Sequence, residues 1–179
     1  MISLRSQITK HLLGFLFIHE KESFYINQLA RELNVDRGNL IRKLSELEKE
    51  GLLQSEYRGH QRYYSLNRKY PLYSEYRDII RKTIGLEAEL TRALKQIGGI
   101  QKAYLFGSYA KDKMNILSDI DLLVIGQHQS VSLYEKLSGI QKQFGRTINA
   151  MSMGPLEFER KKKGSFLSQV LKGIIIELV

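Results

Sequence analysis

The chain has no cysteine and only four histidines, and both facts exclude or disfavour classes of protein. Without cysteine it has neither disulfides nor thiolate zinc ligands, which is typical of a reducing compartment. The histidines lack a metal-ligand spacing, which argues against a histidine-based metal site. The longest apolar stretch near the N-terminus, residues 12–18, is shorter than the ~20 residues of a membrane span. We therefore predict a cytoplasmic protein that makes no contact with a membrane.

Acidic residues are absent from one segment of the chain. The 28 lysines and arginines exceed the 19 aspartates and glutamates and give a net charge of +9. From Tyr57 to Ser74 there is no acid, while arginines and tyrosines alternate. Such a segment favours a polyanionic partner, although charge alone does not identify it.

Hydrophobic periodicity predicts a helical N-terminal part and a C-terminal part in which strands alternate with helices. The predicted order begins with helices at 4–19, 26–33 and, after an Asp36 N-cap, 37–49, followed by a hairpin of strands 52–57 and 61–66. One or two helices span 71–97, with a break at Gly85. Strands at 100–106, 119–125 and 146–151 and helices at 131–144, 155–163 and 165–173 follow, and residues 174–179 are strand or helix.

The N-terminal order of three helices and a hairpin is the layout of a winged helix-turn-helix, in which the third helix enters the DNA major groove. If Leu40, Leu44 and Leu47 face the core, the other side of this helix faces outward. Arginine suits guanine edges and asparagine suits adenine edges, and hairpin cations would contact phosphates. The predicted base-reading residues are Arg37, Asn39 and Arg42, and the predicted phosphate contacts are Arg58, His60 and Arg62.

The segment from Ile8 to Leu66, with the run INQLARELNVDRGNLIRKLSELEKEGLL, resembles the winged-helix regulators of the arsenical-repressor type. The resemblance implies double-stranded DNA as a partner and a homodimer. Two alternatives stay open: the exposed cations are merely solvated and the tyrosines are core, or the winged helix binds protein or only dimerises.

The segment YLFGSYAKDKMNILSDIDLLVIG carries the chemistry of the C-terminal part. Glycine at position 107 lets the backbone approach a phosphate, and Ser108 adds a hydroxyl at a helix start. Asp119 and Asp121 lie two residues apart on a strand and so share one face. Two carboxylates in this arrangement can hold Mg²⁺ that also binds triphosphate oxygens. The predicted catalytic and metal residues are Asp119 and Asp121, and the predicted nucleotide-binding residues are Gly107, Ser108, Lys111 and Ser118.

This combination of Phe106-Gly107-Ser108, a gap of ten residues and Asp119-x-Asp121 resembles the nucleotidyltransferase superfamily related to DNA polymerase beta. The small size resembles its minimal members, several of which act as antitoxins that modify a HEPN-type toxin. The resemblance implies transfer of a nucleoside monophosphate from ATP or another nucleoside triphosphate, with Mg²⁺.

The sequence departs from that family at two positions. Lys111 stands where many members have arginine, which removes bidentate phosphate recognition. Active members usually carry a third carboxylate on a later strand, and the matching position here is Asn149, whose amide can neither accept the acceptor's proton nor add charge. The loop residue Asp112 is a conceivable substitute, but nothing in the sequence places it at the site.

We therefore predict an α+β fold in which an N-terminal winged helix-turn-helix is joined by helices to a small nucleotidyltransferase domain with a mixed sheet. The predicted domains are a DNA-binding domain at 1–70, a helical linker at 71–98 and a nucleotidyltransferase domain at 99–179. The predicted function is a DNA-binding regulator that transfers a nucleoside monophosphate to an unknown acceptor, with a partner toxin as a candidate. The alternative is a transcriptional regulator whose transferase fold is inactive and serves as a nucleotide sensor or dimerisation module.

Overall fold

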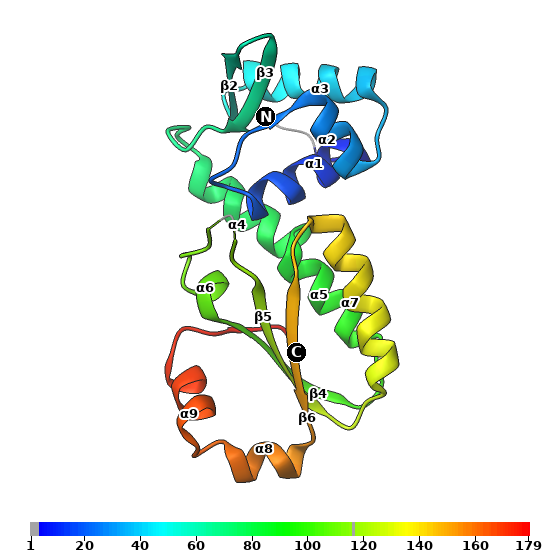
Figure 1. The fold of residues 1–179 in the computed structure, drawn as a ribbon, viewed down its shortest axis with the longest axis vertical. Helices are drawn as coiled ribbons and strands as arrows, with labels where there is room; N and C mark the ends of the chain where they lie inside the picture. Colours follow the sequence, from blue (N-terminus) through cyan, green and yellow to red (C-terminus); the bar gives the residue numbers. More distant parts are fainter. Residues whose placement is uncertain (1–3, 116) are drawn as a thin grey trace. The chain divides into compact units, whose positions relative to one another are not determined.

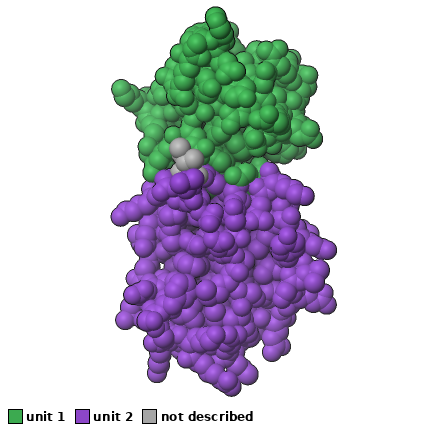
Figure 2. Space-filling model, viewed as in Figure 1, with its two compact units in different colours: residues 1–88, 143–145 green, residues 89–142, 146–179 purple. Residues whose placement is uncertain are grey.

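The computed structural model describes residues 4–115 and 117–179, so residue 116 of the motif gap lies outside the described residues. The chain divides into two compact units, residues 1–88 with 143–145 (unit 1) and residues 89–142 with 146–179 (unit 2) (Figure 2). Each unit is described by itself below. The domain boundaries at residues 70 and 98 stay a prediction.

Unit 1 consists of helices and a three-stranded antiparallel sheet of order β1-β3-β2 (Figure 1). The order of its elements agrees with the predicted order of three helices followed by a hairpin. The short strand β1 is too brief to carry a strand pattern in the sequence. The elements are α1 (Gln7–Ile18), β1 (Phe24–Tyr25), α2 (Ile26–Leu33), α3 (Arg37–Lys49), β2 (Leu53–Arg58), β3 (Gln61–Leu66) and α4 (Tyr73–Thr83).

Helix α3 begins and ends where its sequence predicts. The side chain of Asp36 accepts a hydrogen bond from the backbone N–H of Asn39 at 2.9 Å, which satisfies an amide that the first helical turn leaves unpaired. Gly51, just past the other end, has a φ of +88°, the left-handed conformation that glycine adopts without strain. Leu40 and Leu44 are fully buried, so the opposite side of the helix faces solvent.

Removing the Asp36 cap is expected to destabilise the protein. Asp36→Ala leaves the Asn39 amide without its acceptor and should lower the free energy of unfolding by about 1 kcal/mol. Asp36→Asn keeps an acceptor oxygen at the same place and should match the wild type within a few tenths of a kcal/mol. Urea denaturation of both full-length variants measures the difference, and equal losses in the two would show that the cap contributes nothing.

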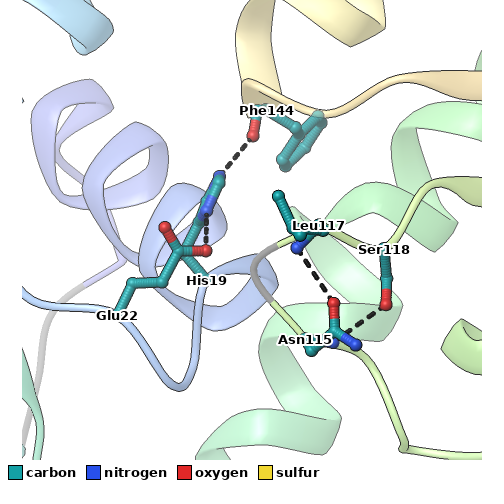
Figure 3. A network of polar contacts seen from close by, with 6 residues as sticks. All are labelled: His19, Glu22, Asn115, Leu117, Ser118 and Phe144. Carbon is teal, nitrogen blue, oxygen red and sulfur yellow. Dashed lines mark hydrogen bonds and ion pairs between the residues drawn. The ribbon is translucent and has the colours of Figure 1, made fainter.

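The last two residues of α7 (Ser130–Phe144) and the glycine that follows it belong to unit 1. The imidazole of His19 is buried; its Nδ1 lies 2.8 Å from Glu22 Oε1 and its Nε2 lies 2.7 Å from the carbonyl oxygen of Phe144 (Figure 3). The ring also stacks on Phe15, with centroids 4.3 Å apart. These contacts account for the inclusion of the 143–145 turn in unit 1.

The predicted break at Gly85 is confirmed, because α4 ends at Thr83 and α5 (Leu86–Lys95) begins after it. The Gly85 N–H donates to the carbonyl of Ile80 at 2.6 Å. A Cβ on Gly85 would lie 2.8 Å from that same oxygen. The tight turn therefore requires glycine.

Unit 2 is built on a four-stranded sheet of order β6-β5-β4-β7 (Figure 1). Strand β4 is antiparallel to β5 and β7, whereas β5 and β6 are parallel, so the sheet is mixed, as predicted. The end of the chain, for which the sequence allows strand or helix, contains a strand. The elements after α5 are β4 (Ile100–Phe106), α6 (Gly107–Ala110), β5 (Ile120–Gly126), α7 (Ser130–Phe144), β6 (Ile148–Met153), α8 (Pro155–Lys161), α9 (Ser165–Lys172) and β7 (Ile176–Glu177).

Alternate residues of β5 point to opposite faces of the sheet, which decides which side chains lie on each face. Leu123 and Ile125 form a core cluster with Leu167 of α9 and Phe158 of α8, so these helices cover that face. Asp121 is two residues before Leu123 and points to the same face. The motif acids therefore lie at the open end of the face that α8 and α9 cover. Among the described helices, none is both long and apolar enough to cross a lipid bilayer.

Candidate nucleotide site

Gly107 lies where β4 ends and α6 begins. Its φ is +72°, and a Cβ at this position would lie 2.1 Å from Asp121 Oδ2. The two residues meet because Phe106 pairs with Asp121 in the antiparallel ladder of β4 and β5. The carboxylate of Asp121 therefore lies directly against the Gly107 backbone, and only glycine leaves room for it.

Asp119 and Asp121 flank the fully buried Ile120 at the start of β5. Asp119 is exposed and Asp121 is half-buried. Burial, and in addition repulsion by the Asp119 carboxylate, raises the pKa of Asp121 above its ordinary value. Each carboxylate thus lies within the electrostatic influence of the other, and a shared cation would relieve their repulsion. Hard carboxylate oxygens are the ligands that Mg²⁺ prefers, so the pair fits this ion.

Asn149 of β6 lies beside the two acids. It is opposite Asp121 in the parallel pairing of β5 with β6, and its Nδ2 donates a hydrogen bond to Asp119 Oδ2 at 3.2 Å. The position that the sequence assigns to the third family carboxylate thus faces the pair and holds an amide. Among the described residues, no group of three or more histidine, cysteine, aspartate or glutamate side chains could hold a metal ion.

The loop that leads to the acids is closed by its own polar contacts. The hydroxyl of Ser118 accepts a hydrogen bond from the backbone N–H of Asn115 at 3.0 Å, and Asn115 Oδ1 accepts from the N–H of Leu117 at 2.9 Å (Figure 3). In this structure the Ser118 hydroxyl therefore shapes the loop. Its part in nucleotide binding stays a prediction.

A pocket of about 190 Å³ opens next to Gly107. The rings of Phe106 and Phe166 meet edge to face within its wall, with centroids 6.2 Å apart and planes at 79°. Lys111, an exposed residue directly after α6, supplies a positive charge at the same pocket. The lining residues are Phe106, Gly107, Lys111, Phe166, Gln169, Val170, Gly173 and Ile174.

The sequence does not single out the α9 side of this pocket. Phe166 and Gln169 lie about sixty positions after Gly107 in the sequence, and the pattern of their helix is that of an ordinary amphipathic surface helix. Only the packing of α9 across the sheet brings them next to the glycine turn. Asp112, considered in the sequence as a substitute carboxylate, is exposed and adopts a left-handed φ of +54° just after α6.

In unit 1 the predicted base-reading residues lie together on the exposed side of α3. Arg37, Asn39 and Arg42 are all exposed. Arg42 Nη2 donates to Asn39 Oδ1 at 3.1 Å, and Arg37 Nε donates to Asn27 Oδ1 of α2 at 3.0 Å. The side chains therefore share one surface, with hydrogen bonds that a DNA base would have to replace.

The three predicted phosphate contacts of the wing differ in what surrounds them. Arg58 pairs with Glu56 and lies over the Tyr63 ring, 4.7 Å from its centroid. His60 is exposed at the hairpin turn. Arg62 instead links β3 to α3, because its Nη2 donates to Glu48 Oε2 at 2.7 Å and its Nε to Ser55 at 2.9 Å. The ion pair gives Arg62 a structural role in joining β3 to α3, and its phosphate contact stays a prediction.

Comparison with known proteins identifies the family of the C-terminal half. A family model described as a nucleotidyltransferase domain matches residues 87–176, half of the 179-residue chain. MJ0604 of Methanocaldococcus jannaschii, whose name proposes protein adenylyltransferase activity, is 34% identical over 86 residues. These residues cover 47% of this chain and 86% of MJ0604.

Two solved structures of toxin–antitoxin pairs are similar over part of the chain. A mutant of the MntA–HpeT pair is 18% identical over 52% of this chain and 72% of that one, with a TM-score of 0.40. The tri-AMPylated Shewanella oneidensis HEPN toxin in complex with MNT antitoxin is 19% identical over 52% and 68%, with a TM-score of 0.35. The assignment rests on the family model and on MJ0604: the chain belongs to the nucleotidyltransferase domain family.

Proposed function

We propose that the chain transfers adenosine monophosphate from ATP to a protein acceptor, with Mg²⁺ held by Asp119 and Asp121. The observation that carries the proposal is the contact of the Asp121 carboxylate with the Gly107 turn, which brings a phosphate-approach site and a metal-binding pair together. The protein acceptor is supported by the similarity to MJ0604, a relative named for protein adenylylation.

The residues around the Gly107 turn would bind the triphosphate in different ways. The first backbone amides of α6 lack intrahelical acceptors and can donate to phosphate oxygens, Ser108 adds a hydroxyl, and Lys111 adds a positive charge. Bound Mg²⁺ would neutralise phosphate charge and make the α-phosphorus easier to attack. The acceptor oxygen forms a bond to the α-phosphorus as the bond to the β-phosphate breaks, and pyrophosphate leaves.

We also propose that the pocket beside Gly107 receives the adenine ring. Its aromatic wall of Phe106 and Phe166 offers an apolar surface for a planar base, and the amide of Gln169 can both donate to and accept from the base edge. A mostly apolar pocket with few polar groups is the usual form of such a binding site.

A label-transfer experiment tests the proposal. The full-length protein is incubated with Mg²⁺ and ATP labelled at the α- or the γ-phosphate, together with a candidate acceptor. A HEPN-type toxin is the first acceptor to try, since the resemblance to the minimal nucleotidyltransferase antitoxins implies it. We expect label on the acceptor from α-labelled ATP alone. Transfer of the γ-label would show phosphorylation, and ATP binding without any transfer would favour the nucleotide sensor of the alternative function.

We further propose that unit 1 binds double-stranded DNA through α3 and the β2–β3 wing, as a homodimer. The specific observation is the exposed group of Arg37, Asn39 and Arg42 on the outer face of α3 in a winged-helix topology. The third helix of this fold reads the major groove while the wing approaches the backbone. Lysine and arginine contacts to phosphates make such binding fall steeply with salt.

Removing the Arg58 charge is expected to weaken DNA binding and to reduce its salt dependence. With a random-sequence duplex, Arg58→Ala should lower the slope of log affinity against log salt by about 1. Glu56→Gln frees Arg58 from its ion pair and should raise the affinity. Lys142→Ala removes an equal charge from an exposed position of α7 and should leave the slope unchanged. Fluorescence anisotropy at several salt concentrations measures the DNA affinity of the three variants and of the wild type. A wild-type affinity that does not change with salt would refute DNA binding.

A further inference from the structure

The amide of Asn149 points its NH₂ group toward Asp119. Its Nδ2 lies 3.2 Å from Asp119 Oδ2 and donates to it. An ionised carboxylate accepts hydrogen bonds and cannot donate them, so the amide must present its NH₂ group rather than its oxygen. The reverse orientation would place two oxygens with negative partial charge against each other. The β6 side of Asp119 therefore presents N–H hydrogens with positive partial charge.

This orientation affects how many cations the site can hold. One divalent ion balances the two negative charges of Asp119 and Asp121 and takes its remaining ligands from phosphate and water. A second ion on the β6 side would meet the NH₂ group of Asn149, which has no lone pair to offer a metal. Among the described residues, no group of three or more histidine, cysteine, aspartate or glutamate side chains could hold a metal ion, so no third acid joins the pair.

We propose that Asn149 restricts the nucleotide site to a single divalent metal ion per chain. This inference rests on the proposed function, because it takes Asp119 and Asp121 as the metal ligands. Asn149 acts here through Asp119 and through the metal that it keeps out, so it is a positioning residue. The Asn149 side chain is exposed, which leaves room for a substitution without repacking the core.

The restriction has a consequence for the acceptor. With an amide at position 149, neither a carboxylate base nor a second ion lies on the β6 side of the site to activate the attacking hydroxyl. We therefore expect the proton of that hydroxyl to pass to a base that the acceptor protein itself carries, or to water. Acceptors with a basic group beside the modified hydroxyl are accordingly favoured.

Counting bound manganese tests the proposal without relying on activity. The full-length protein is saturated with a non-hydrolysable ATP analogue and titrated with Mn²⁺, and free Mn²⁺ is followed by electron paramagnetic resonance. We expect one nucleotide-dependent Mn²⁺ per chain in the wild type and two in Asn149→Asp, whose carboxylate supplies the missing ligand. Asn149→Ala is the matched control; it removes the hydrogen bond without adding charge and should still bind one.

The outcomes separate this inference from the proposed function. Two Mn²⁺ ions in the wild type, or one in folded Asn149→Asp, would overturn the role of Asn149 and leave the proposed function standing. No nucleotide-dependent Mn²⁺ in the wild type would overturn both. Urea denaturation checks that Asn149→Asp is folded; if it is not, Asn149→Glu carries the carboxylate farther into solvent and is titrated in the same way.

Discussion

Gly107→Ala is expected to weaken nucleotide binding strongly. The new methyl group would lie 2.1 Å from Asp121 Oδ2, so the carboxylate must leave its position or the turn must open. Alanine is also strained at a φ of +72°, which costs on the order of 1 kcal/mol or more of folding stability. Because either movement separates the metal-binding pair from the phosphate-approach turn, we expect the affinity for an ATP analogue with Mn²⁺ to fall at least about 100-fold, which corresponds to about 2.7 kcal/mol.

Gly139→Ala is the matched control for this variant. Gly139 lies within α7, and a Cβ added there meets nothing within 4 Å. The substitution should raise the free energy of unfolding by up to about 1 kcal/mol through helix propensity and leave nucleotide affinity unchanged. Isothermal titration measures affinity and urea denaturation measures stability. A folded Gly107→Ala protein that binds the analogue as tightly as the wild type would show that this turn does not hold the nucleotide.

Replacing both acids, Asp119→Asn with Asp121→Asn, is expected to remove nucleotidyl transfer while keeping the fold. The amides preserve the shape of the side chains but carry no charge for Mg²⁺. Loss of metal assistance is worth several kcal/mol of barrier, so we expect the transfer rate to fall by about 10³-fold or more. The α-label assay measures this rate, and transfer at the wild-type rate would place the catalytic metal site elsewhere.

The single variant Asp121→Asn separates stability from activity. Burial and the Asp119 carboxylate raise the pKa of Asp121, so its ionised form costs folding stability at neutral pH. Asp121→Asn should therefore be at least as stable as the wild type near pH 7, although it is inactive. The advantage should shrink as the pH falls, because Asp121 then becomes protonated in the folded wild type and its cost disappears. A variant that is less stable at neutral pH would contradict this account.

The local patterns of the sequence predict most elements and the core of the candidate site. The Asp36 cap, the Gly85 break and the strand β4 lie where hydrophobic spacing and turn chemistry place them. Asp119 and Asp121 are recognisable because two acids interrupt the start of an apolar strand, and strand parity assigns them to one face. Each of these features depends on residues that are close in sequence, which is why the sequence suffices for them.

Contacts between distant segments required the structure. The sequence shows Arg62 as a wing cation, but its ion pair with Glu48, fourteen positions earlier, ties it to α3. The acidic pair likewise gains its neighbour only through sheet pairing, because the β5–β6 ladder brings Asn149 next to Asp119 across thirty positions. The Phe166 side of the pocket depends on the packing of α9 against the sheet.

By itself the sequence determined the two-part α+β organisation, the order of the helices and strands, and the choice of Gly107, Asp119 and Asp121 as candidate site residues. These follow from helix and strand periods and from the backbone freedom of glycine, all of which act over a few residues. Only the tertiary structure decided that the Asp121 carboxylate lies against Gly107 and that Asn149 presents its NH₂ group to Asp119. Such contacts join segments far apart in the chain, and they depend on which strands pair and in which register.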